Sequence, residues 1–370
     1  MKIQMNDWIK RKIEKTQFNR YVFGSSVKSV EQSFGIERSK IIRLNMNENF
    51  FIPRDKLTQI IIDVVENLDP RLYPQEEEQE FREKISLHLQ VPTDNISVGN
   101  GSDELIERIV RLLLESGEQA LTISPTFSIY RYAVNFQRAE LIEVPLKAEF
   151  SLDISGLLSK VSPKTRVLFL CSPNNPTANQ FKMDEIKSLV ESFPGIVIVD
   201  EAYVEFAEYS VVPLTCKYRN LIVLRTFSKA FGLAGLRLGY CVANTEFAEA
   251  LSRNVGLPYS VNTIALRVGA KILDNKSLVE QAVKQLKVER EKMIKNLNSV
   301  NGVEAFNSQT NFVLFKTDKT SNQVYEGLLQ RGIIIKNLGA VLKFQNCFRA
   351  TVGLPDMNAR LIEALKEICT

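Results

Sequence analysis

The sequence predicts an α/β fold whose large sheet is mostly parallel, followed by a smaller α+β unit. Between about residues 45 and 255, short apolar runs alternate with helical patterns, and strands that alternate with helices form parallel sheets. From about residue 260 the pattern changes to a long charged helix at 277–298, followed by further strands and helices. At 370 residues the chain is long enough for more than one domain. We expect an N-terminal arm at 1–45, a large domain at 46–254 and a small C-terminal domain at 255–370.

Each expected strand is a short apolar run bounded by turn residues. In the large sheet these runs are NISVG at 95–99, ALTIS at 120–124, RVLFL at 166–170, IVIVD at 196–200 and LIVLR at 221–225. In the small unit we expect strands in TNFVLF at 310–315, GIIIK at 332–336 and FRATVG at 348–353, a helix near 321–331 and a final helix. Ligands of parallel sheets bind at the carboxyl ends of the strands, so candidate site residues are sought there.

The composition excludes several classes of function. The chain carries 47 lysines and arginines against 43 acidic residues, and a net charge of +4 is too small to indicate a nucleic acid or a membrane as partner. Its single histidine, His88, excludes a zinc site built from several histidines, and we expect no metal. The five cysteines form no CxxC pair, which is typical of reduced thiols and predicts a cytoplasmic protein.

The segment LRTFSKAFGLAGLRLGY at 224–240 contains the candidate nucleophile. Lys229 follows an apolar strand and lies among small and apolar residues, an environment that lowers the pKa of a lysine and makes its amine nucleophilic. A Schiff base to an aldehyde cofactor needs such an amine. The hydroxyls of Thr226 and Ser228, together with Arg237, are suited to hold a phosphate.

Two polar segments follow other expected strands. Asp200 ends the run IVIVD, where a buried carboxylate needs a partner such as a protonated pyridine nitrogen, and Tyr203 is placed to donate to a cofactor oxygen. A helix N-cap explains Asp200 equally well. Asn174 and Asn175 lie between prolines after RVLFL, where an amide can bond a cofactor hydroxyl or form an ordinary Asx turn.

Two further segments are ambiguous when each is taken alone. Gly101, Ser102 and Asp103 open an amphipathic helix whose backbone N–H groups suit a phosphate, although Ser102 also fits a plain N-cap. Phe127 follows a strand and a proline, where a ring stacks on a planar cofactor or packs in the core. A lysine, an aspartate, an amide, a tyrosine, a stacking ring and a phosphate cup at one sheet edge are together what pyridoxal 5′-phosphate requires.

The motifs also follow the order found in one known family. They are RYVFG, LNMNENF, LYPQ, GNGSDELI, PTFSIY, CSPNNPT, VDEAYVEF, RTFSKAFGLAGLRLGY, PYSVN, TNFVLF and RATVG. On these motifs the chain resembles the fold-type-I pyridoxal-phosphate aminotransferases of class II from about residue 20 to its end, and within them it is most similar to the histidinol-phosphate aminotransferases. The resemblance implies a large domain with a mostly parallel seven-stranded sheet and a small α+β domain.

The resemblance assigns roles to the residues around the cofactor. It implies that Lys229 forms the Schiff base and moves a proton, that Asp200 pairs with the pyridine nitrogen, and that Asn175 and Tyr203 bond the ring hydroxyl. Phe127 matches the stacking position. The phosphate group would be held by residues of two segments: Gly101, Ser102, Asp103, Thr226, Ser228 and Arg237.

It also assigns residues to the substrate and to a second subunit. Arg349 matches an arginine that grips the anionic end of the substrate, and Tyr21 and Asn47 match positions near it. Lys336 stands in GIIIK where the family has a second anion-binding arginine, and lysine keeps the charge but loses the two-pronged hydrogen bonding. Tyr73 matches a tyrosine that reaches the phosphate of the neighbouring subunit, which implies a homodimer with shared active sites.

The expected reaction is transamination of L-histidinol phosphate with 2-oxoglutarate, which gives imidazole-acetol phosphate and glutamate in histidine biosynthesis. The partners would be a small amino donor and a 2-oxo acid. Three alternatives keep the cofactor: an aromatic amino acid aminotransferase, an aminotransferase for another small amino phosphate, and an amino-acid-phosphate decarboxylase. A cofactor-sensing regulator is disfavoured because the chain carries no basic helix-turn-helix extension.

Overall fold

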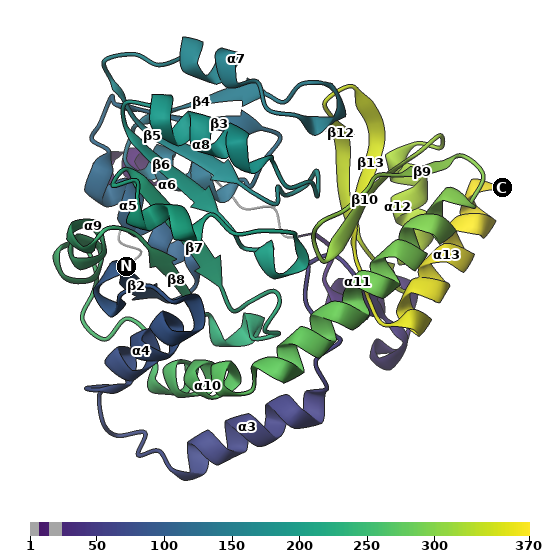
Figure 1. Cartoon of the computed structure of the whole chain (residues 1–370). Coiled ribbons are helices and arrows are strands. Elements are labelled where there is room, and N and C mark those ends of the chain that lie inside the picture. The colour runs from purple at the N-terminus through teal and green to yellow at the C-terminus, as the bar shows by residue number, and fades with distance from the viewer. Residues whose placement is uncertain (1–6, 15–23) are drawn as a thin grey trace.

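The computed structural model describes residues 7–14 and 24–370, and its largest element is a seven-stranded sheet (Figure 1). In spatial order its strands are β2 (Ile96–Gly99), β8 (Gly239–Val242), β7 (Leu221–Thr226), β6 (Ile196–Asp200), β5 (Thr165–Cys171), β3 (Gln119–Ser124) and β4 (Glu140–Pro145). Strand β8 runs in the opposite direction to the other six strands, so its pairs with β2 and β7 are antiparallel and the remaining pairs are parallel. The predicted mostly parallel sheet is therefore confirmed, although β4 and β8 are not among the strands expected from the sequence.

Helices cover both faces of the large sheet. Alternate residues of the central strands point to opposite faces, so Phe169 and Ile198 join one apolar cluster while Leu168 and Val197 join the other. The first cluster includes α5 (Ser102–Leu113) and α6 (Ile129–Phe136). The other α-helices between residues 54 and 274 are α3 (Arg54–Glu66), α4 (Glu77–Leu89), α7 (Ile154–Ser159), α8 (Met183–Ser192), α9 (Thr245–Glu249) and α10 (Thr263–Asp274). Burial on both faces explains why these strands are apolar at nearly every position.

A second, antiparallel sheet is built from the C-terminal part of the chain. Its order is β12 (Lys336–Val341), β13 (Phe344–Thr351), β10 (Phe312–Thr317) and β9 (Val303–Ala305). The helices that pack with it are α11 (Lys276–Asn298), α12 (Ser321–Leu329) and α13 (Pro355–Cys369) (Figure 1). The segment GIIIK does not form one strand but divides between β11 (Ile333–Ile334) and the start of β12. The domain boundaries at 45 and 254 stay a prediction.

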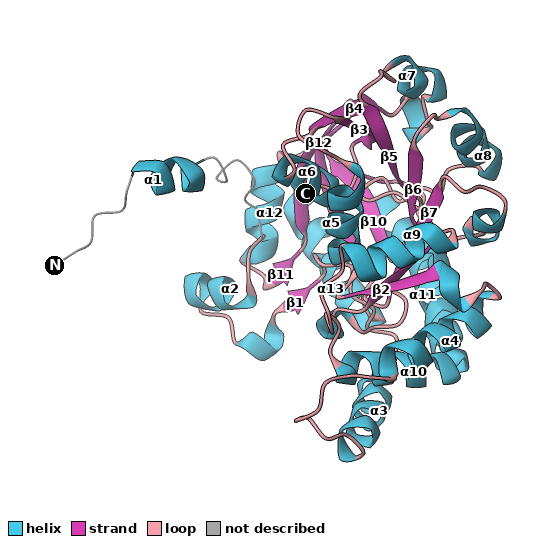
Figure 2. Ribbon diagram, turned by 90° about the vertical axis from the view of Figure 1, so that its left-hand side faces the viewer, coloured by secondary structure: helices cyan, strands magenta, loops and turns pink. Residues whose placement is uncertain are grey.

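The N-terminal segment is joined to this second part of the structure. Strand β1 (Ile42–Arg43) pairs in parallel with β11, and α2 (Val27–Phe34) lies beside them (Figure 2). Val30, Ile41, Leu329 and Ile334 form a small buried cluster at this contact. Helix α1 (Asp7–Glu14) precedes α2. No helix within the described part of the chain is both long and apolar enough to cross a membrane.

Candidate active site

A cavity lies at the carboxyl ends of β5, β6 and β7, where the sequence predicted a site. Residues from segments far apart in the sequence line it. They are Met46, Asn47, Ser102, Asp103, Phe127, Cys171, Asn175, Asp200, Ala202, Tyr203, Thr226, Ser228, Lys229, Arg237 and Arg349. The structure therefore brings most of the predicted site residues to one place.

Lys229 follows β7 by three residues and lines the cavity. Its Nζ donates a hydrogen bond to the backbone oxygen of Met46 at 3.1 Å and lies 5.8 Å from the centre of the Tyr203 ring. Burial lowers the pKa of Lys229 to about 8, and the positive charge of Arg349 acts in the same direction. A substantial fraction of this amine is therefore uncharged and nucleophilic near neutral pH.

Asp200 is the last residue of β6 and is 2% exposed. Its Oδ1 accepts a hydrogen bond from the backbone N–H of Ala202 at 3.1 Å, and its Oδ2 accepts one from the Tyr130 hydroxyl at 2.8 Å. Burial raises the pKa of Asp200 to about 6. A buried carboxylate of this kind is stabilised by a cation placed in the cavity, as a protonated pyridine nitrogen would be.

The start of α5 and the end of β7 form a polar cup at the cavity's other end. Arg237 Nη2 donates to Asp103 Oδ2 at 2.9 Å, and its Nη1 lies 3.4 Å from Ser228 Oγ. The Ser228 backbone N–H donates to Thr226 Oγ1 at 3.1 Å. Gly101 does not line the cavity but precedes α5 with φ +88°, and a Cβ there would lie 2.7 Å from Arg237 Nη2. The positive φ strains any residue with a Cβ, and a Cβ would also displace the Arg237 side chain, so glycine is favoured at this position.

Arg349 closes the cavity from the second sheet. Its Nη1 donates to Asn175 Oδ1 at 2.5 Å and its Nη2 donates to the backbone oxygen of Asn45 at 2.8 Å. The guanidinium carbon also lies 5.3 Å from the centre of the Phe312 ring. Lys336 is the direct cross-strand neighbour of Arg349 in the β12–β13 pair, and burial and the charge of Arg349 lower the pKa of Lys336.

A second cavity adjoins the first and contains Lys336. The two cavities share Met46, Phe127, Asn175 and Arg349. The additional lining comes from α6, β12 and the loops near them: Gly24, Asn45, Pro125, Thr126, Ser128, Tyr132, Pro176, Leu338, Ala340 and Val341. Arg349, which lines both cavities, and Lys336, which lines the second, therefore lie where the polar first cavity meets the more apolar second cavity.

Tyr73 lies outside both cavities. Tyr73 is 75% exposed and stacks on Tyr259 with ring centres 5.1 Å apart, on a loop outside the cavity. The role of Tyr73 at a neighbouring subunit stays a prediction. Tyr21 lies outside the described residues. Asn47 lines the first cavity, and its Nδ2 donates to the Tyr203 hydroxyl at 3.0 Å, while its role near the substrate stays a prediction.

The sequence reasoning missed some residues of the site. Cys171 and Ala202 line the cavity, and Tyr130 contacts Asp200 from α6. Tyr130 lies within the motif PTFSIY, three residues after Phe127, but an apolar helix start gives no local sign of a distant aspartate. The amides differ as well: Asn175 lines the cavity, whereas the buried Asn174 bonds Thr177 in its own loop and Pro125 and Thr126 in the loop after β3.

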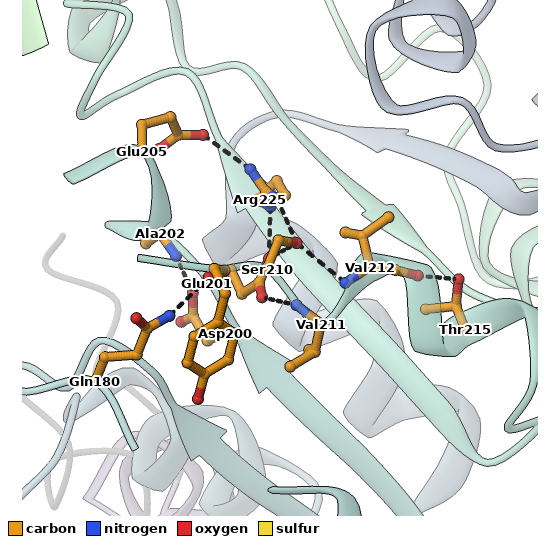
Figure 3. A network of polar contacts seen from close by, with 11 residues as sticks. Gln180, Asp200, Glu201, Ala202, Glu205, Ser210, Val211, Val212, Thr215 and Arg225 are labelled. Carbon is orange, nitrogen blue, oxygen red and sulfur yellow. Dashed lines mark hydrogen bonds and ion pairs between the residues drawn. The ribbon is translucent and has the colours of Figure 1, made fainter. Parts of the chain in front are cut away.

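A buried polar network lies directly behind Asp200 (Figure 3). Glu201 Oε2 accepts hydrogen bonds from Arg225 Nε and from Ser210 Oγ, both at 2.8 Å, and Glu201 Oε1 accepts one from the Val211 backbone N–H at 2.6 Å. Arg225 Nη1 also donates to Glu205 Oε1 at 3.0 Å. The network ties the segment after β6, which carries Tyr203, to β7, which precedes Lys229.

The donor set fits a phosphate-bearing pyridine aldehyde. It provides an amine of lowered pKa, a buried carboxylate of raised pKa, and a cup lined by the hydroxyls of Thr226 and Ser228 and the guanidinium of Arg237. Within the described part of the chain, the buried Asn47 Oδ1 has no hydrogen-bond partner and is left to accept one from a ligand. Among residues 7–14 and 24–370, no group of three or more His, Cys, Asp or Glu side chains is arranged to hold a metal ion.

Comparison with known families agrees with this geometry. The profile of the family Aminotransferase class I and II matches residues 39–365, and the chain belongs to this family. The expected aminotransferase class, its fold and its cofactor, pyridoxal 5′-phosphate, are therefore confirmed.

Individual relatives point to one subgroup. The histidinol-phosphate aminotransferase of Caldanaerobacter subterraneus subsp. tengcongensis is 37% identical over 88% of this chain and 92% of its own length. That of Methanosphaera stadtmanae is 31% identical over 95% of this chain and 97% of its own. A solved structure, histidinol-phosphate aminotransferase from Sinorhizobium meliloti in complex with pyridoxal-5′-phosphate, shares the fold with a TM-score of 0.86 at 23% identity, covering 96% of both chains.

Proposed function

We propose that this aminotransferase transfers the amino group of L-histidinol phosphate to 2-oxoglutarate, in histidine biosynthesis. The observation that carries the proposal is the pair of cations Arg349 and Lys336, which are direct cross-strand neighbours. Arg349 lines the cavity that holds Lys229, and Lys336 lines the cavity that adjoins it. A donor that ends in a phosphate dianion needs such a pair, since two positive charges bind it better than one. The names of the relatives at 37% and 31% identity support the same substrate.

The cofactor would be held by the residues that line the first cavity. Asp200 would bind the pyridine nitrogen, Asn175 and Tyr203 the ring hydroxyl, and Phe127 the ring face. The phosphate would lie in the cup formed by the start of α5 and the segment after β7: Gly101, Ser102, Asp103, Thr226, Ser228 and Arg237. When bound, pyridoxal phosphate supplies an electron sink for the electrons of the substrate Cα–H bond.

Lys229 would perform two tasks. Its amine is nucleophilic because burial lowers its pKa to about 8, so it can hold the cofactor covalently. Once displaced by the amino donor, the same Nζ would take the proton from the substrate Cα and deliver it to the cofactor carbon that had carried the aldehyde. The second half of the cycle, with the oxo acid, uses the same residue in reverse.

Arg349 and Lys336 would bind the anionic ends of the two substrates in turn. The phosphate of the amino donor and the distal carboxylate of 2-oxoglutarate both place negative charge at one end of a small molecule. Tyr21 and Asn47 are proposed to lie near the substrate. Arg349 would rearrange its hydrogen bond to Asn175 when a substrate enters, because that bond occupies one edge of its guanidinium group.

We further propose a cytoplasmic homodimer in which Tyr73 completes the phosphate cup of the partner site. Leu72, Tyr73 and Leu257 are 68%, 75% and 67% exposed, and exposed apolar groups of this size are typical of an interface between subunits. All five cysteines are free, in keeping with a reducing compartment.

The test is an absorbance scan of the purified holoenzyme while L-histidinol phosphate is added without an oxo acid. We expect the band of the aldehyde form of the cofactor to convert to that of the amine form, and 2-oxoglutarate to restore it. If the band of the aldehyde form does not change on addition of histidinol phosphate, the proposed amino donor is refuted, while the assignment of the cofactor site is unaffected. Phenylalanine, serinol phosphate and threonine phosphate would then be compared as donors.

A further inference from the structure

Tyr130 makes a hydrogen bond to Asp200 that none of the roles above requires. Tyr130 lies on α6, and its side chain is fully buried. Its hydroxyl donates to Asp200 Oδ2 at 2.8 Å, while the Ala202 N–H donates to Oδ1 at 3.1 Å. One donor on each oxygen fixes the plane of the carboxylate, so the contact controls the direction in which Asp200 faces the cavity.

The tyrosine is itself held rigidly. Its ring stacks on Phe169 of β5 with centres 4.7 Å apart and planes 11° apart. Phe127, which lines the cavity, meets the same ring edge-on at 5.8 Å and 89°. Contacts on the face and on the edge leave the Tyr130 ring no other position in this close-packed core. The hydroxyl is therefore a donor of fixed direction.

We propose that Tyr130 is a positioning residue that acts through Asp200 to orient its carboxylate and keep it ionised towards the pyridine nitrogen of the cofactor. The inference rests on the proposed cofactor site but not on the identity of the substrate. A hydroxyl that donates to a carboxylate favours the charged form, because the protonated form accepts this bond less well. An ionised Asp200 is in turn what keeps a pyridine nitrogen protonated.

The surroundings of Asp200 explain why this donor is needed. Burial raises the pKa of Asp200 to about 6, and the negative charges of Asp103 on α5 and Glu201 act in the same direction. The Tyr130 hydroxyl and the Ala202 N–H oppose them. The other titratable groups that face this spot are the Cys171 thiol on β5 and the Tyr203 hydroxyl, and burial raises the pKa of both. Without the Tyr130 donor, Asp200 would take up a proton at a higher pH.

The test compares Tyr130→Phe with Tyr240→Phe, first as apo-proteins titrated with pyridoxal 5′-phosphate. Tyr240 is a suitable control because it is also buried, on β8, and its ring packs near Phe227 rather than at the cavity. We expect Tyr130→Phe to weaken cofactor binding about 10-fold and to move the acidic limb of the kcat profile up by about one pH unit, from the usual strength of a hydrogen bond to a charged group. Tyr240→Phe should change the affinity for the cofactor by less than about 2-fold and should leave the acidic limb of the kcat profile where it is in the wild type.

A double-mutant cycle separates positioning from mere packing. In an Asp200→Asn background, we expect Tyr130→Phe to weaken cofactor binding by less than about 2-fold, because the group it acts through is gone. An equal loss in both backgrounds would overturn the proposal, as would wild-type cofactor affinity in Tyr130→Phe. If circular dichroism shows that Tyr130→Phe does not fold, 3-fluorotyrosine at position 130 replaces it. Its more acidic hydroxyl is a stronger donor, so the acidic limb should move down, and an unmoved or raised limb would refute the role.

Discussion

Replacing Arg225 with leucine removes the cation that neutralises two buried carboxylates. The side chains of Arg225, Glu201 and Glu205 are only 6%, 1% and 18% exposed. The ion pairs are short, 2.8 Å from Arg225 Nε to Glu201 Oε2 and 3.0 Å from Nη1 to Glu205 Oε1. Removing one partner of a buried pair costs about 3–5 kcal/mol, because the other charge stays buried without compensation. We therefore expect Arg225→Leu to lower the free energy of unfolding by about 4 kcal/mol.

The cost should depend on pH in a defined direction. Burial already raises the pKa of Glu205 above its ordinary value, and removing Arg225 raises it further because Arg225 is the main group that lowers it. A carboxyl group whose folded pKa exceeds its unfolded pKa contributes stability at low pH and loses it as pH rises through the folded value. The deficit of Arg225→Leu should consequently be smaller at pH 5 than at pH 8.

Urea unfolding followed by circular dichroism at pH 5 and pH 8 measures the free energy of unfolding of Arg225→Leu. We also expect this variant to have a melting temperature about 5 °C lower than the wild type. Arg219→Leu is the matched control, since the Arg219–Glu246 pair has side chains that are 76% and 80% exposed and should contribute less than about 1 kcal/mol. Equal losses for the two variants, or a larger deficit at pH 5, would refute the reasoning.

Three further changes test the site itself. Lys229→Ala should reduce turnover by about 10³-fold or more, because it removes both the nucleophile and the group that moves the proton; near-normal steady-state activity would contradict the assignment. Arg349→Gln should raise the pH midpoint, near 8, at which Lys229 reacts with added pyridoxal phosphate, because the charge of Arg349 helps to lower the pKa of that lysine. Stopped-flow absorbance from pH 6.5 to 9.5 measures this midpoint, and a lower midpoint in the variant would contradict the effect assigned to Arg349. Lys336→Gln should raise KM for histidinol phosphate about 10-fold, and Lys336→Arg should lower it, whereas unchanged KM values would remove Lys336 from the substrate site.

The carboxyl ends of the parallel strands could be located from the sequence because the signals there are local. The run IVIVD predicts the strand that forms β6 with the same bounds, 196–200, and so places Asp200 at its end. Lys229 is found in the same way after LIVLR. Parallel strands that share one direction bring such residues to the same sheet edge, so their proximity follows from the topology alone.

Contacts between distant segments were decided by the tertiary structure. Tyr130 and Asp200 are 70 residues apart, and Arg349 and Asn175 are 174 apart. Neither pair leaves a periodic or compositional trace, because the geometry that joins them is set by how α6 and β13 pack against the large sheet. The choice of Asn175 over Asn174 as the cavity residue has the same origin, since Asn174 is held by hydrogen bonds to Thr126 in the distant loop after β3 and to Thr177 in its own loop.

What the sequence determined by itself is the class of fold, five of the seven strands of the large sheet and the chemical groups at their ends. The period of the hydrophobic residues and the positions of turn residues reflect the local conformation of a few neighbouring residues. A sequence pattern therefore predicts local structure. What only the tertiary structure decided is which side chains share a hydrogen bond, how buried each charge is and hence the pKa of Lys229 and Asp200. Desolvation depends on everything packed around a group, and that surrounding shell is assembled from the whole chain.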